Sequence, residues 1–161
     1  MRNLACVVLV MSVCNFFSIS GSLWAADQLE SPGSKITREK KLKAKISVDC
    51  DNMMLREIIA ELQGGLKDAK AGTIRIKPDP KAGITLTTRM SIKAKNEPFE
   101  KVLDRLLENS GRPWGYYVFV SPKKDDQDDG AIIITNDATC RGFPPGDPRN
   151  QKAKEEPKKK K

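Results

Sequence analysis

Residues 91–111 have the sequence SIKAKNEPFEKVLDRLLENSG, in which a strand pattern changes directly into a helix pattern. Apolar and polar side chains alternate up to Ala94, as in a strand with one buried face. Asn96-Glu97-Pro98 then offers a capping side chain and a proline suited to a first helical turn. The apolar residues that follow recur at helical spacing and share one face: Phe99, Val102, Leu103, Leu106 and Leu107. We therefore expect a strand and an amphipathic helix that ends near Gly111.

A similar stretch lies upstream at residues 46–62, with the sequence ISVDCDNMMLREIIAEL. Its strand residues Ile46 and Val48 precede Ile92 and Ala94 by 46 positions. Its helix residues precede their counterparts by 44 positions and also share one face: Leu55, Ile58, Ile59 and Leu62. The sequence therefore predicts two strand–helix halves that pack together.

Shorter β-prone runs at residues 73–77, 114–120 and 131–135 complete the pattern, the last two flanking a polar loop. The predicted fold class is α+β, a small βαββαββ domain with two amphipathic helices packed on a small sheet. Residues on the apolar faces of these elements form the predicted core: Leu55, Ile58, Ile59, Leu62, Phe99, Val102, Leu103, Leu106, Ile46, Val48, Ile74, Ile92 and Ile133.

The composition excludes several kinds of chemistry. The 161 residues include no histidine, which removes Ser-His-Asp and Cys-His nucleophiles and imidazole metal sites. The net charge is +8, yet residues 45–140 contain 15 Lys and Arg and 15 Asp and Glu, so the excess lies at the ends. A neutral domain argues against a nucleic-acid groove. We expect no enzymatic activity, no cofactor, no metal and no nucleic-acid partner.

The N-terminus is typical of a secretory signal. Arg2 precedes a mostly apolar run over residues 4–19, and small residues follow up to Ala26. The interpretation is cleavage after Ala25 or Ala26, which places residues 27–161 in the periplasm or outside the cell without an integral membrane span. The alternative is a retained anchor, since residues 4–26 fall within the roughly 17–25 residues that can cross a bilayer.

Polar segments flank the predicted domain of residues 45–137. Residues 27–44 form a polar lead-in, in which residues 36–43 suit a short helix. Residues 138–161 are rich in Pro, Gly, Lys and Glu and predict a disordered tail. The tail ends in Lys158, Lys159, Lys160 and Lys161, which suit either contact with an anionic membrane or wall polymer or a solubilising end. The second interpretation is favoured, because four lysines alone bind weakly at physiological salt.

Cys50 and Cys140 are the two cysteines beyond the signal segment, and their spacing fits neither a redox nor a zinc motif. They are the candidate disulfide pair after export.

Two further patterns have a functional and a structural interpretation. Asp125, Gln127, Asp129 and Gly130 partly match the start of a calcium loop, but position twelve is Asn136, so a solvated loop is favoured. The aromatic run Trp114, Tyr116, Tyr117 and Phe119 suits base or sugar stacking; aromatic residues also simply form strands, and this second interpretation is favoured.

Taken with residues 74–80 and the paired end strands, the two quoted stretches resemble the short N-terminal domain of secretins and TonB-dependent receptors, a family of periplasmic α+β modules. The likeness covers about residues 45–136 and is best over residues 92–111. Met53-Met54 departs from it, as do the linker through residues 84–89 and the lack of a following channel or barrel. The resemblance implies protein–protein contact in the cell envelope and supplies no catalytic residues. The alternative function is binding of an anionic membrane or wall polymer through the tail.

Overall fold

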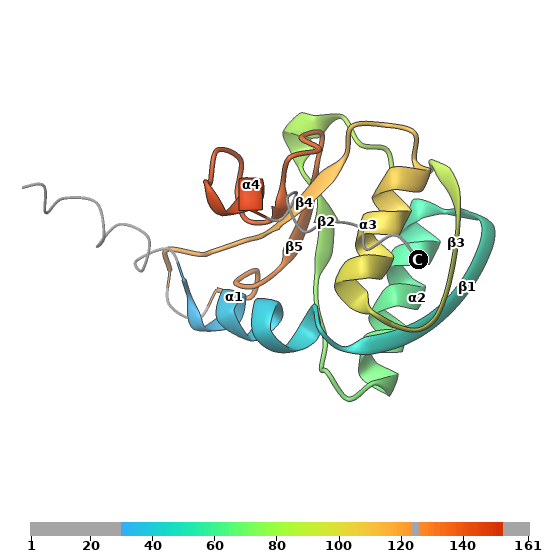
Figure 1. Ribbon diagram of the computed structural model, residues 1–161, viewed down its shortest axis with the longest axis horizontal. Coiled ribbons are helices and arrows are strands. Elements are labelled where there is room, and N and C mark those ends of the chain that lie inside the picture. Colours follow the sequence, from blue (N-terminus) through green and yellow to red (C-terminus); the bar gives the residue numbers. More distant parts are fainter. Residues whose placement is uncertain (1–29, 124–125, 153–161) are drawn as a thin grey trace, which may run out of the picture.

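The computed structural model describes residues 30–123 and 126–152 (Figure 1). The α+β class is confirmed, and so is the βαββαββ order: β1 (Lys45–Met54), α2 (Leu55–Asp68), β2 (Ile76–Pro78), β3 (Arg89–Pro98), α3 (Phe99–Asn109), β4 (Gly115–Val118) and β5 (Ile132–Thr135). Further elements are α1 (Pro32–Ile36), the π-helix η2 (Thr37–Lys41), the 3-10 helix η3 (Pro80–Ala82), β6 (Arg141–Gly142) and α4 (Arg149–Lys152).

The strands form two sheets, where the sequence predicts one. β1 and β3 form an antiparallel pair, and the other strands form a four-stranded sheet in the order β2-β5-β4-β6. In Figure 1, α2 and α3 lie between the two sheets. Each helix has one apolar face against its own strand, and the strands after the helices close the core from the other side.

The two halves repeat with a uniform spacing of 44 residues, because β1 and β3 have the same length and the same burial pattern. Val48 therefore corresponds to Ile92 and Cys50 to Ala94, so the spacing of 46 predicted for the strands is wrong. Side chains alternate along a strand with period two, and a shift of two residues therefore fits an apolar pattern almost as well.

Each half also closes the start of the other half's helix. The Leu55 N–H donates to the Thr88 carbonyl, and 44 residues later the Phe99 N–H donates to the Ala44 carbonyl, both at 2.8 Å. The Ser91 and Ser47 hydroxyls also link the halves, since they accept from the N–H groups of residues 52 and 96 in the opposite strand. Helix N-termini leave donors without partners inside the helix, so these exchanges bind the two halves into one unit.

The predicted core is confirmed at twelve of its thirteen positions. Ile133 is the exception and is only partly buried, whereas Ile132 and Ile134 are fully buried. The three isoleucines are consecutive, so the sequence does not tell which face of β5 points inward.

The described structure extends beyond the predicted domain at both ends. Thr37 in the lead-in is buried and donates to the Gly130 carbonyl at 2.9 Å. At the other end, β6 pairs with β4 and Asn150 is buried, so the start of a disordered tail at residue 138 is wrong for residues 138–150. Asn150 fixes this stretch by accepting from the Arg141 N–H and donating to the carbonyls of Phe143 and Pro144.

Candidate functional site

Strand β4 has an incompletely covered edge. β6 pairs with β4 only opposite Tyr116 and Tyr117, and Phe143, Pro144 and Pro145 then turn away. Proline has no N–H to donate to a ladder, which explains why the pairing stops there. The N–H and C=O of Phe119 both bond toward β5, at 2.8 and 3.0 Å.

The next residue, Val120, therefore presents its N–H and C=O to the opposite side. Neither group has a hydrogen-bond partner among the described residues. The edge of β4 is thus open just past the end of β6.

A hollow of about 220 Å³ lies beside this edge, and we call it the β4 cleft. Its lining is mostly apolar and comes from three segments: Arg38, Tyr117, Val118, Phe119, Val120, Pro144 and Arg149. The two arginines also stack on Phe143, with guanidinium carbons 4.5 Å (Arg38) and 4.1 Å (Arg149) from the ring centre. Cation–π stacking of this kind holds both guanidinium groups in place.

Arg38 leaves one donor free. Its Nε donates to the Gly142 carbonyl at 3.2 Å, and its Nη1 lies 3.3 Å from Glu30. Its Nη2 is buried and has no hydrogen-bond partner among the described residues. Burial lowers the pKa of Arg38 from its usual value, against the opposing effect of Glu30. A buried donor without an acceptor is costly, so a partner that brought an acceptor to Nη2 would be favoured.

Arg149 is already paired within the chain. Its Nη2 lies 2.7 Å from Asp147, and its Nη1 lies 3.5 Å from Glu30. The cleft therefore combines apolar walls, an open strand edge and one unsatisfied donor.

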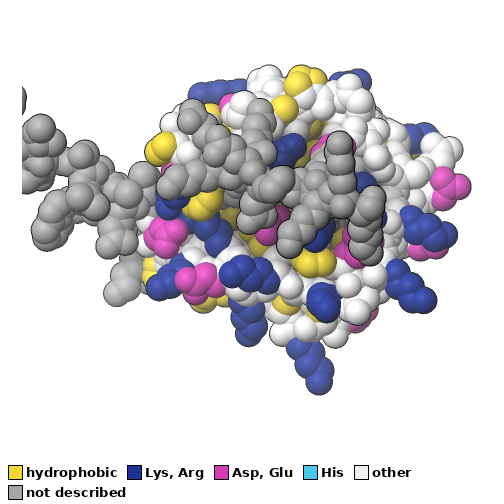
Figure 2. Space-filling view, viewed as in Figure 1, with side chains coloured by type: hydrophobic (Ala, Val, Ile, Leu, Met, Phe, Trp, Pro, Cys, Tyr) yellow, Lys and Arg dark blue, Asp and Glu magenta, His cyan; other side chains and the backbone are white. Residues whose placement is uncertain are grey.

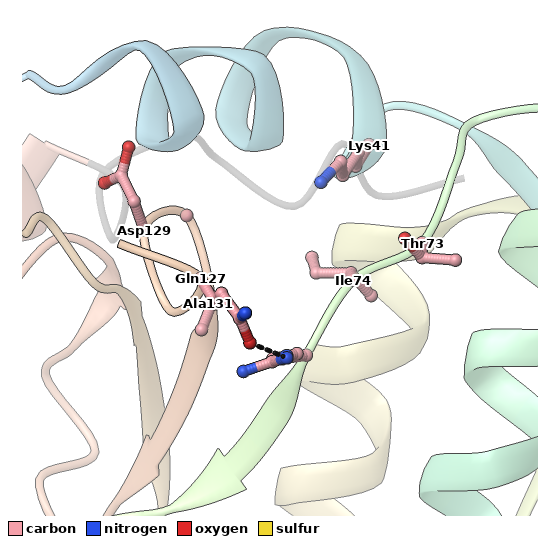
Figure 3. Close-up of a pocket in the computed structure, with 8 residues that line it drawn as sticks. Lys41, Thr73, Ile74, Gln127, Asp129 and Ala131 are labelled. Carbon is pink, nitrogen blue, oxygen red and sulfur yellow. Dashed lines mark hydrogen bonds between the residues drawn. The ribbon is translucent and has the colours of Figure 1, made fainter. Parts of the chain in front are cut away.

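A second hollow, of about 410 Å³, lies between η2, residues 73–75 before β2, and residues 127–131 (Figure 3). Its polar groups already bond to one another: Arg75 donates to Gln127 at 2.8 Å and to Asp128 at 2.9 Å. In Figure 3, Asp129 points toward α1. Burial lowers the pKa of Lys41 at the rim. These contacts make it a weaker candidate than the β4 cleft.

The acidic residues of the loop between β4 and β5 form contacts within the chain. Asp129 accepts from the Ser31 hydroxyl and from the Gly33 N–H, which fixes α1 on the loop. Lys77 donates to Asp128 at 2.7 Å, and the Ser121 hydroxyl donates to Asp126 at 2.7 Å. No metal-binding group of three ligands is found in residues 30–123 and 126–152, and Asp125 lies outside them.

The predicted disulfide is not formed. Cys50 and Cys140 are both buried and free. Cys50 belongs to β1, while Cys140 precedes β6 in the four-stranded sheet, and in Figure 1 the helices lie between those sheets. Burial raises the pKa of both thiols, that of Cys140 to about 11. The sequence placed both cysteines just beyond predicted strand ends, but it did not reveal that they belong to two different sheets.

The aromatic run divides between core and cleft. Trp114 and Tyr116 are buried, whereas Tyr117 and Phe119 are partly buried and line the β4 cleft. Sequence reasoning missed Arg38, Pro144 and Arg149, which lie in the segments predicted as lead-in and tail. The predicted signal segment and Lys158, Lys159, Lys160 and Lys161 lie outside the described residues.

Charges of both signs are mixed on the face of the molecule that Figure 2 shows. Basic and acidic side chains are interspersed over this face rather than gathered in one basic patch. Within the described part of the chain, every helix is too short or too polar to cross a membrane.

No family model, curated protein or solved structure matches this chain.

Proposed function

We propose that the chain is an exported, non-enzymatic binding module of the cell envelope, similar in role to the short N-terminal domain of secretins and TonB-dependent receptors. Export is supported by the signal pattern of residues 1–26. The resemblance is supported by a strand that enters α3 through Pro98, by the turn at Gly111 and by the antiparallel pair β4–β5. Mass spectrometry of the exported chain that finds residues 1–25 still attached would contradict cleavage.

The β4 cleft is the docking site in this proposal, and the open backbone of Val120 is the observation that carries it. An extended segment of a partner protein adds to β4 beyond β6 and bonds to Val120. An apolar side chain of the segment fills the cleft, and one of its carbonyl or carboxylate oxygens accepts from Arg38. Strand addition of this kind draws affinity from the backbone and specificity from pockets beside the strand.

The test is a matched pair of variants at Val120. Val120→Pro removes the N–H that a partner strand needs, while Val120→Ala keeps it. Proline is tolerated where a strand N–H faces solvent, so both variants are expected to melt like the wild type. Affinity capture from the native envelope extract should recover the same partner with wild type and Val120→Ala. Val120→Pro should bind it about 10-fold more weakly, the value of one hydrogen bond.

Recovery of the same partner at equal strength by all three chains would overturn edge docking at β4. If none of the three chains recovered a partner, the binding function itself would be overturned.

A further inference from the structure

The two halves of the repeat differ at the outer edges of their strands. On β3, two side chains of α3 close the edge: Arg105 donates to the Lys93 carbonyl at 2.7 Å, and Asn109 donates to the Ser91 carbonyl at 3.1 Å. Covering an exposed edge is a common way to prevent strand pairing with other molecules. β3 is therefore closed to a further strand.

On β1 the corresponding positions of α2, 44 residues earlier, are Glu61 and Gly65. A carboxylate and a glycine have no side-chain donor for a carbonyl. Asp49 lies opposite Lys93 in the antiparallel pair. Opposite residues of an antiparallel pair either exchange both hydrogen bonds or both point away from each other. The Lys93 carbonyl accepts from Arg105 and so points away from β1, and Asp49 therefore presents its own backbone groups to the outer edge of β1. No side chain of the described residues donates to the Ser47 or Asp49 carbonyl.

Because of Gly64 and Gly65, the part of α2 beside the outer edge of β1 has no side chains. Both lie inside α2, where each glycine weakens the helix relative to alanine. Packing within the chain does not require them. A Cβ at Gly64 would meet nothing within 4 Å, and one at Gly65 would lie in ordinary contact, 3.5 Å from Ile46. Their absence of side chains leaves room for a close neighbour at the β1 edge.

The exposed face of β1 has a self-complementary charge pattern. Lys45 precedes Ser47 and Asp49 follows it at alternate positions of β1, and all three side chains are exposed. In an antiparallel pair centred on Ser47, Lys45 meets Asp49 of the second copy, and symmetry forms this pair twice. On the buried face the same register places Ile46 against Val48.

The backbone fits the same register. Lys45, Ser47 and Asp49 are two residues apart, so backbone groups that point outward meet outward groups of the second copy. Asp49 also pairs with Lys93 of its own chain at 2.7 Å, but both side chains are exposed and such a pair is weak. The carboxylate is therefore available to Lys45 of a neighbour.

From this geometry we infer that β1 pairs with β1 of a second copy of the chain, which gives a two-fold dimer with a continuous β3-β1-β1-β3 sheet. In Figure 1, β1 and β3 lie on the side of the helices away from the four-stranded sheet. The dimer therefore leaves the β4 cleft accessible, and the inference does not depend on the proposed function.

Sedimentation equilibrium of the full exported chain tests this pairing. The wild type should dimerise. Lys45→Glu and Asp49→Lys should each weaken the dimer about 10-fold or more, because each places like charges opposite one another twice. The double variant Lys45→Glu/Asp49→Lys should restore it, since the register pairs the exchanged charges again. Lys95→Glu, an exposed change on the closed strand β3, is the matched control and should leave dimerisation unchanged.

Gly65→Asn gives a second readout, because it places at the β1 edge the residue type that closes β3. This variant should be monomeric and melt at or above the temperature of the wild type. A wild type that stays monomeric up to about 1 mM, where even weak specific pairs associate, would overturn the inference. A double variant that fails to recover would overturn it as well.

Discussion

At the scale of single residues, Asp104 on α3 has a partly buried carboxyl group with a poorly satisfied oxygen. Arg141 Nε lies 3.0 Å from Asp104 Oδ1, but without hydrogen-bond geometry, and that oxygen accepts no hydrogen bond from any residue that the structure describes. The buried Tyr116 hydroxyl also has no partner among the described residues. Burial raises the pKa of Asp104 from 3.8 to about 6, and Arg141 only partly opposes this. Burial also raises the pKa of Tyr116, and the charge of Asp104 adds to that effect.

Asp104→Asn should therefore change how stability depends on pH. The folded state holds the proton more tightly than the unfolded state, so ionisation of Asp104 lowers wild-type stability as the pH rises from about 4 to about 7. The variant should lack this loss and be more stable at pH 7 by about 1–2 kcal/mol, after allowance for the solvent exposure of the carboxyl. Urea unfolding at pH 4, 5.5 and 7 measures this difference, with Asp68→Asn, an exposed change on α2, as the control. Parallel pH curves for wild type and Asp104→Asn would refute the assignment.

At the scale of elements, α3 lies between the two sheets (Figure 1). Leu103 is fully buried on its apolar face. Leu103→Ala should lower the free energy of unfolding by about 2–5 kcal/mol, since it removes a large side chain from a packed core. Lys101→Ala, an exposed change on the same helix, should stay within about 0.5 kcal/mol of the wild type. Denaturant unfolding of both variants measures these changes in the free energy of unfolding. Equal stability of Leu103→Ala and wild type would place Leu103 outside the core.

The elements themselves were predictable where the apolar period is long. α2 and α3 each carry four or more apolar residues at helical spacing, and both helices occur where the sequence predicts them. The division of the strands into two sheets was not predictable, because a strand pattern shows which face is buried but not which strand is its neighbour. The same limit explains the orientation of Ile133 and the spacing of the strand repeat.

At the scale of the whole molecule, the β4 cleft forms where segments far apart in the sequence meet. Arg38 comes from the lead-in, Phe119 from the strand region, and Pro144 and Arg149 from the segment predicted as tail. Only the aromatic strand was a visible candidate in the sequence. The described parts of the lead-in and tail contain few apolar residues, so hydrogen bonds such as those of Asn150 hold them in place, and hydrogen bonds leave no periodic signal in the sequence.

The most direct test of partner docking at β4 is amide hydrogen exchange of Val120 in the full exported chain, with and without the segment that the chain captures. The Val120 N–H should exchange fast in the free chain, where it has no hydrogen-bond partner among the described residues, and it should be strongly protected in the complex. The Phe119 N–H, which bonds to Ala131 in the free chain, should be protected in both states. A bound segment that leaves Val120 exchanging at its free rate would contradict strand addition at this edge.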